Sequence, residues 1–215
     1  MNLKFLYIGA LAAMNYFLPA TTSEKIAFGT TTASLTPVFF GTKDYLMVPG
    51  PIEFMQKKYN LSYSAHPTAQ YFQQEYIVKG ELPEKYNEMV MVQLMLGDVK
   101  IQDAVAAKVK ELQIRKENDP IVNFKVTNLP KSGEIVLEFT LSAGEGAARI
   151  AEWNVYRYHT YSQATTKQHG ISLFGFSKRF YGKKADQLIK DAANGLGTVK
   201  TEFLKLQSPN VKPTH

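Results

Sequence analysis

The sequence predicts an α+β domain, in which an antiparallel meander of about six strands carries two amphipathic helices on one face. Two observations lead to this prediction. From Gln70 onward, apolar and polar residues alternate in six stretches of strand length, which is the periodicity of half-buried strands. Four of these stretches follow one another without a helix between them, so they are expected to pair antiparallel, because parallel strands need a long crossover connection.

The first 22 residues have the layout of a secretory signal peptide. Lys4 gives a basic start, residues 5–18 are almost wholly apolar, and small residues follow at 20–23. This layout predicts cleavage after Ala20 or Thr22 and a periplasmic or secreted mature protein. An apolar run of about 14 residues is too short to span a bilayer, so the alternative is a retained anchor or a buried N-terminal helix. We expect no transmembrane segment after cleavage.

Residues 23–69 are rich in turn formers, among them Gly29, Pro37, Gly41 and Pro49-Gly50-Pro51. Only short apolar groups lie between these residues, so the segment is expected to be irregular and to pack on a core built elsewhere. A structureless stretch of this length is unusual within a compact domain, which suggests that it serves packing or binding.

Residues 70–206 form the predicted α+β domain, and its strands are expected at 71–79, 88–96, 121–127, 134–142, 149–161 and 170–181. Each stretch is bounded by glycine, proline or a short polar loop, as strands in a meander are. The sheet is expected to have one buried and one wetter face.

Two segments have helical spacing. The first, residues 99–116, follows Asp98 as its expected N-cap and aligns Ile101, Val105, Val109 and Leu112 in one stripe. The second, residues 184–206, has an apolar face but carries Gly195 and Gly197 near its middle, where glycine disfavours a helix. There we expect a kink or a close approach to the sheet. Residues 207–215 are expected to form a flexible tail.

Composition excludes several classes of chemistry. The 215 residues include no cysteine, which rules out disulfides, thiolate nucleophiles and cysteine-ligated zinc. The net charge is +6, and removal of Lys4 with the signal peptide lowers it to +5. The lysines are dispersed along the chain, so we expect a solvated basic surface and no nucleic-acid partner.

No catalytic motif is present, and we assign no catalytic residue, metal site or cofactor. His159 and His169 flank the loop 160–168, and a hairpin there would bring the two histidines together, with Glu138 or Glu152 nearby. Such a group could hold a metal ion or act in a hydrolase. The simpler interpretation is a pair of surface histidines at the mouth of a hairpin.

The segments 152–159 and 174–181 have the most distinctive composition, because both combine aromatic residues with arginine. If they pair, alternation would put Arg157 and Arg179 on one face, suited to hold a carboxylate or phosphate. The candidate binding residues are Trp153, Tyr156, Arg157, Tyr158, Arg179 and Tyr181. The alternative is ordinary cross-strand packing, in which each arginine pairs with Glu138 or Glu152.

One strand of the predicted sheet ends in Glu75-Tyr76-Ile77-Val78-Lys79-Gly80-Glu81, and the next opens with Tyr86-Asn87-Glu88-Met89-Val90-Met91-Val92-Gln93. With the helix and strands that follow, this pair resembles small secreted α+β domains of the PsbP-like type over roughly residues 71–206. The resemblance implies a non-catalytic accessory or binding protein.

Two functions from different classes follow. The first is an exported, non-enzymatic envelope protein that binds a partner protein or a small apolar or anionic ligand. It predicts an exposed aromatic and arginine surface, or a pocket between the sheet and the C-terminal helix. The alternative is a periplasmic hydrolase or metal-binding protein that uses His159 or His169 with a carboxylate.

Overall fold

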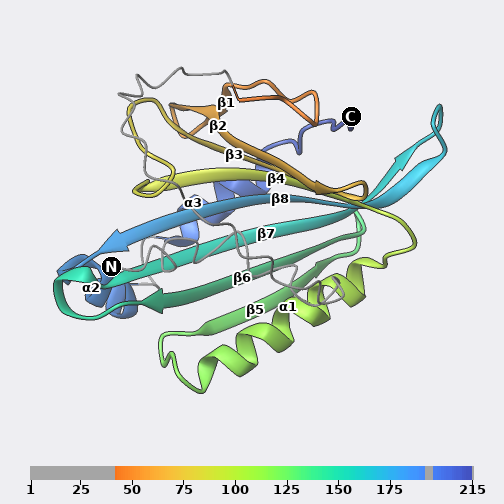
Figure 1. Cartoon of the computed structure of the whole chain (residues 1–215). Helices are drawn as coiled ribbons and strands as arrows, with labels where there is room; N and C mark the ends of the chain where they lie inside the picture. Colours follow the sequence, from red (N-terminus) through yellow and green to blue (C-terminus); the bar gives the residue numbers. More distant parts are fainter. Residues whose placement is uncertain (1–41, 192–195, 215) are drawn as a thin grey trace, which may run out of the picture.

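A computed structural model describes residues 42–191 and 196–214. Within these residues, eight strands form one antiparallel sheet in the order β1-β2-β3-β4-β8-β7-β6-β5 (Figure 1). In chain order the strands are β1 (Ile52–Phe54), β2 (Lys57–Thr68), β3 (Tyr71–Val78), β4 (Glu88–Leu96), β5 (Asn123–Leu129), β6 (Glu134–Ala143), β7 (Ile150–Gln163) and β8 (Gln168–Tyr181). The helices are α1 (Ile101–Lys116), α2 (Lys183–Asp191) and α3 (Leu196–Lys205), with a short 3-10 helix at Gly146–Ala148.

The predicted α+β class with about six strands is wrong, because the described chain is mostly β and its eight-stranded sheet curls into a half-barrel. The two additional strands, β1 and β2, come from the segment that was expected to be irregular. The residues of β2 do alternate, but a bulge between Leu61 and Tyr63 splits the pattern into two short pieces. Neither piece is long enough to stand out from the turn formers that precede it.

The six predicted strands are confirmed to within about two residues at each end, and the hairpins β5 to β8 form the predicted meander. The first helix is also confirmed, with Ile101, Val105 and Leu112 buried. Its N-cap, however, is Lys100 and not Asp98. Asp98 instead lies 2.7 Å from His169 Nε2, so its carboxylate contacts the β7–β8 hairpin.

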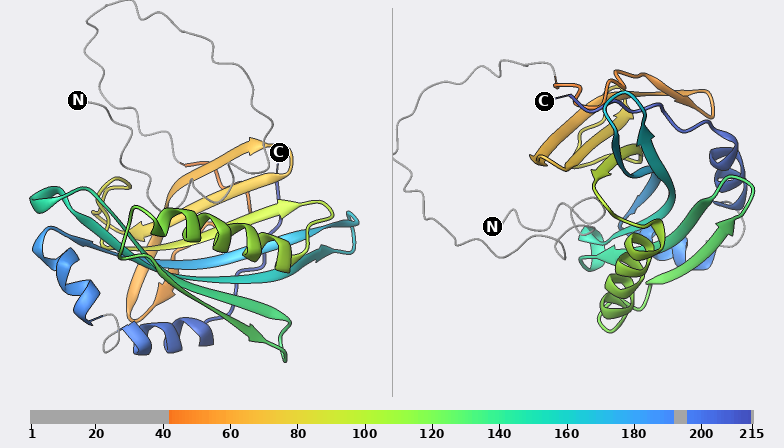
Figure 2. Two further views of the ribbon diagram at one scale, coloured as in Figure 1. Left: turned by 90° about the horizontal axis from the view of Figure 1, so that it is seen from below. Right: turned by 90° about the vertical axis from the view of Figure 1, so that its right-hand side faces the viewer.

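The helices cover opposite faces of the sheet, which corrects the expectation that they share one (Figure 2). Helix α1 carries the chain from β4 to the far edge strand β5 and packs on β5, β6 and β7. Helices α2 and α3 lie on the other face, where α2 contacts β7 and β8. As a result the central strands are buried on both sides, and β3, β4, β7 and β8 show near-continuous burial instead of alternation.

The predicted C-terminal helix is two helices, and residues 192–195 between them lie outside the described residues, as do residues 1–41 with the predicted signal peptide. None of the described helices has the length and apolar character that crossing a bilayer requires.

Each face of the sheet has its own hydrophobic core. On the α2–α3 face, Phe203 of α3 packs against Phe54, Phe174 and Phe176 with ring centroids 4.8–5.7 Å apart. On the α1 face, Phe139 and Tyr156 meet edge to face at 4.9 Å beneath the buried stripe of α1. The rings around Phe203 therefore hold α3 against the sheet, whereas the Phe139–Tyr156 pair joins β6 to β7. Each ring pair of this kind stabilises the fold beyond its buried area.

The C-terminal residues, expected as a flexible tail, run beside residues 45 and 46. The amides of Lys212 and Thr214 donate to the carbonyls of Leu46 and Tyr45 at 2.8 Å, and Val211 is buried. These bonds tie the two ends of the described chain together.

Candidate functional site

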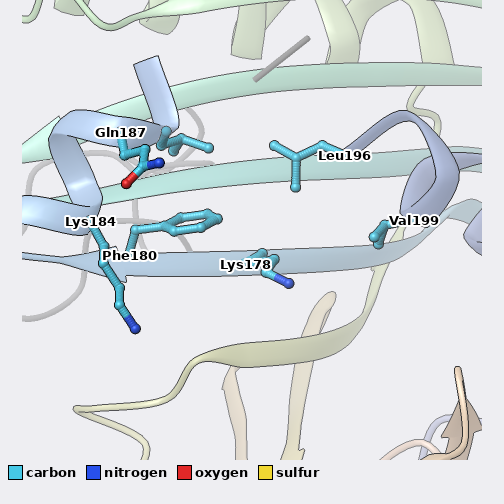
Figure 3. Close-up of a pocket in the computed structure, with 7 residues that line it drawn as sticks. Lys178, Phe180, Lys184, Gln187, Leu196 and Val199 are labelled. Atoms are coloured by element: carbon cyan, nitrogen blue, oxygen red, sulfur yellow. The ribbon is translucent and has the colours of Figure 1, made fainter. Parts of the chain in front are cut away.

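An open pocket of about 330 Å³ lies between β8 and the helices α2 and α3 (Figure 3). It is lined by Lys178, Phe180, Lys184, Gln187, Leu188, Leu196 and Val199. These side chains come from three consecutive elements at the C-terminal end of the fold.

Local periodicity explains why these residues converge. Lys178 and Phe180 are two apart on β8, so both point to the α2–α3 face. Lys184 and Leu188 are four apart on α2, and Leu196 and Val199 are three apart on α3, so each pair lies on one side of its helix. The predicted single helix is divided into α2 and α3. Because of this division, the pocket-lining side of each helix faces the same stretch of β8.

The walls of the pocket are apolar and its charged side chains are basic. Phe180 and Leu196 face the cavity, while Lys178 and Lys184 lie on one side of it (Figure 3). Leu188 also lines it. Neither a carboxylate nor a histidine is among the lining residues. The pocket therefore offers apolar surface and positive charge, and no acid–base pair.

The two lysines differ in their surroundings. Lys178 Nζ lies 3.0 Å from Glu88 Oε1, and Lys57 Nζ holds the other oxygen of this carboxylate at 2.5 Å. Burial on its own would raise the pKa of Glu88, but hydrogen bonds from Lys57, Lys178 and Tyr59 outweigh it and lower that pKa. Lys184 makes no ion pair with any described residue. Its charge is thus available to a ligand.

The register of β7 and β8 separates the arginines predicted to lie on one face. Glu152 pairs with Arg179, and Arg157 pairs with Phe174. Directly paired residues share a face, so Arg179 lies on the α1 face and Arg157 on the α2–α3 face. Trp153 lies on the same face as Arg157, whereas Tyr156 and Tyr158 lie on the same face as Arg179.

Arg157 holds the end of α3 against the sheet. Its Nη1 donates to the carbonyls of Leu206 at 2.5 Å and Phe203 at 3.3 Å, and its Nη2 lies 3.0 Å from Glu134 Oε1. Trp153, also buried, donates from Nε1 to Glu138 Oε1 at 3.0 Å. Both side chains thus have partners within the fold.

Arg179 belongs to a buried triangle with Glu152 and Tyr86. Its Nη2 lies 2.7 Å from both Glu152 Oε2 and the Tyr86 hydroxyl, which itself donates to Glu152 at 2.8 Å. Burial alone would lower the pKa of Arg179, but the charge of Glu152 raises it. This is the Arg179–Glu152 pair that cross-strand packing predicts. Tyr181 borders the triangle, and its hydroxyl donates to the Tyr86 carbonyl at 2.6 Å.

Tyr156 and Tyr158 are buried beneath α1, and burial raises the pKa of both phenols. The structure therefore places five of the six candidate binding residues in the interior and Tyr181 at partial exposure. That they bind a ligand stays a prediction.

His159 and His169 do not face each other across the hairpin. His159 pairs with Ser172, and His169 pairs with Ser162. Among the described residues, no group of three histidine, aspartate or glutamate side chains is arranged to hold a metal ion.

The pocket residues were not assigned from the sequence, although a pocket between the sheet and the C-terminal helix was expected. The available signal was the pair Gly195 and Gly197, which marked an interruption in an otherwise apolar helical face. The angle between α2 and α3 cannot be predicted from the sequence, and the cavity depends on how these two helices lie over β8.

No curated protein and no solved structure matches the chain closely enough to count as a relative. One protein-family model matches residues 46–207, which include all the strands and helices of the described residues, and the chain therefore belongs to this uncharacterised family.

Proposed function

We propose that this protein is a non-enzymatic binding protein of the cell envelope, and that its ligand is a small amphipathic anion with an apolar body. The pocket between β8 and the helices α2 and α3 is the observation that supports it. Its volume of about 330 Å³ falls within the range of small-molecule sites.

The lining argues for an apolar body. Phe180, Leu188 and Leu196 present hydrocarbon surface to an open cavity, and covering such surface is favourable by about 25 cal/mol per Å². An alkyl chain or a comparable apolar group satisfies these walls without leaving a polar atom unpaired.

The lysines argue for a negative head group. Lys184 has no carboxylate partner among the described residues, and Lys178 shares Glu88 with Lys57. A carboxylate or sulfonate at this side of the pocket would be attracted by both ammonium groups. The net charge of the whole chain, +6, acts in the same direction over longer distances.

The envelope location rests on the signal-like residues 1–22.

Calorimetric titration with sodium decanoate tests the proposal. The matched variants are Lys184→Glu and Lys183→Glu, which reverse neighbouring charges in the first turn of α2, only one of which lines the pocket. We expect Lys184→Glu to weaken decanoate binding by about tenfold, and Lys183→Glu to weaken it by about twofold or less. Absence of decanoate binding to the wild type, or equal losses in both variants, would contradict the proposal.

A further inference from the structure

A cavity of about 320 Å³ lies where the start of β5 meets β6 and helix α2. We call it the edge cavity, because β5 is an edge strand of the sheet. Its walls include Ile121, Asn123, Thr140 and Leu188. Leu188 also lines the apolar pocket between β8, α2 and α3, and it is the one residue that these two linings share. The edge cavity and the apolar pocket are therefore neighbours with a common wall.

The strand register puts both cavities over one cross-strand row of the sheet. Thr140 of β6 pairs with Trp153 of β7, and Trp153 pairs with Lys178 of β8, so all three share the α2–α3 face. Thr140 lines the edge cavity, and Lys178 lines the apolar pocket. Because neighbouring strands are about 4.8 Å apart, the backbones of these two residues lie roughly 10 Å from each other. A ligand tail of modest length can span this distance.

The direction of α2 leads from the charged side of the apolar pocket to the shared wall. The anionic head group is expected at Lys184, and Leu188 follows one helical turn later. The Leu188 side chain is 3% exposed and belongs to the hydrophobic core on this face. Beyond it, Pro120, Ile121 and Val122 give the edge cavity further apolar walls. An apolar tail that follows α2 from Lys184 therefore meets Leu188 before it reaches these walls.

We propose that Leu188 determines the chain length of the amphipathic anion, because its side chain closes the apolar pocket toward the edge cavity. This inference rests on the proposed function of the apolar pocket and adds a specificity-determining residue to it. Truncation of Leu188 would join cavities of about 330 and 320 Å³. The space open to one tail would then roughly double, and longer chains would be favoured.

Calorimetric titration of the full chain with sodium decanoate and sodium tetradecanoate tests this inference. Each methylene that leaves water strengthens binding by about fourfold. In the wild type, the four additional methylenes of tetradecanoate should strengthen binding by about threefold or less, since the tail has no room beyond Leu188. In Leu188→Ala, they should strengthen it by at least about tenfold, because two or more methylenes enter the edge cavity.

Leu196→Ala is the matched control. Leu196 is also a buried leucine of the apolar pocket, but it does not line the edge cavity. Leu196→Ala should weaken the binding of both anions and keep the wild-type ratio of their dissociation constants. The double variant Leu188→Ala, Asn123→Trp should also return to the wild-type ratio. Asn123 is exposed, and a tryptophan in its place would fill the edge cavity.

A measurement on the wild type tests the same wall without any variant. Nuclear Overhauser effects from the terminal methyl group of bound tetradecanoate should not reach the methyl groups of Ile121, which lie beyond Leu188. Contacts to Ile121, or equal ratios of dissociation constants in Leu188→Ala and Leu196→Ala, would overturn the role of Leu188 and leave the proposed function intact. Failure of the wild type to bind either anion would overturn the proposed function and this inference with it.

Discussion

The buried charges on the α1 face are concentrated around Arg179. Glu152 is fully buried and Arg179 is 5% exposed, so both have lost nearly all their hydration. The cost of removing two such charges from water is offset only when the geometry of the ion pair is good. Here two arginine nitrogens and the Tyr86 hydroxyl all donate to one carboxylate oxygen of Glu152. The arrangement makes the partners strongly dependent on each other.

Replacement of Glu152 by glutamine should lower the free energy of unfolding by about 3 kcal/mol, because it leaves the Arg179 guanidinium buried without its counter-charge. Urea denaturation checks this value. Glu53→Gln is the control, since Glu53 and its partner Lys58 are both largely exposed, and its effect should stay within about 0.5 kcal/mol. Equal effects in the two variants would contradict the role of burial.

Glu75 should make stability depend on pH. Burial raises its pKa to about 7, an effect that a hydrogen bond from Gln73 reduces and the nearby charge of Glu152 increases. Because the folded-state pKa is above the unfolded value, the folded protein holds this proton more tightly. The resulting stabilisation is complete below about pH 4.5 and is lost as the pH rises toward and through 7.

Glu75→Gln should remove this dependence, because an uncharged amide replaces the group that is forced to ionise. The variant should become more stable than the wild type as the pH rises from 5 to 8, by up to about 3 kcal/mol. Urea denaturation at a series of pH values gives the difference. A difference that stays constant across this range would contradict a raised pKa for Glu75.

For single residues, cross-strand ion pairs could be predicted from the sequence better than the face of the sheet on which each side chain lies. The Arg179–Glu152 ion pair was expected as an ordinary cross-strand contact, and the structure confirms it. The partners of Arg157 could not be predicted, because Leu206 is 49 residues away and its carbonyl becomes available only where α3 ends. Contacts of this kind depend on how the chain returns to the sheet.

At the scale of elements, α3 is tied to the sheet by one side chain at its C-terminal end. Arg157 donates to the carbonyl of Phe203, which also accepts from the Leu206 amide at 3.2 Å, and to the carbonyl of Leu206, the residue after α3. Glu134 anchors the guanidinium in this position. Phe203 adds the aromatic contacts that bury the same turn.

Arg157→Met should therefore loosen the last turn of α3, since it keeps the aliphatic stem but removes every donor. We expect faster amide hydrogen exchange across residues 201–206 and a loss of about 3 kcal/mol in the free energy of unfolding. Lys205→Met is the control, because its ion pair with Glu202 is exposed. Unchanged exchange in Arg157→Met would show that the aromatic contacts hold α3 by themselves.

Six strands and α1 could be predicted because each has an uninterrupted periodicity of its own. The ends of helices and the strands at the edge of the sheet could not be predicted, since they depend on contacts with residues that are distant in the sequence. The β2 pattern is divided by a bulge, and Asp98 contacts His169 instead of capping α1. The side of the sheet that each helix covers also follows from the position of β8 next to β4, which no local pattern encodes.

At the scale of the whole molecule, the curled sheet is covered on both faces, and the C-terminal chain forms two cavities at the two ends of α3. The general position of the apolar pocket was expected, whereas its residues were not, because they come from β8, α2 and α3 and meet only after packing. We expect the pocket between β8, α2 and α3 to bind an amphipathic anion.

The most direct test of the central claim is an NMR measurement of nuclear Overhauser effects between decanoate and the methyl groups of the protein. We predict contacts from the alkyl chain to the methyls of Leu188, Leu196 and Val199, which line the apolar pocket. Contacts confined to other methyl groups, or none at saturating decanoate, would contradict the assignment of this pocket as the binding site.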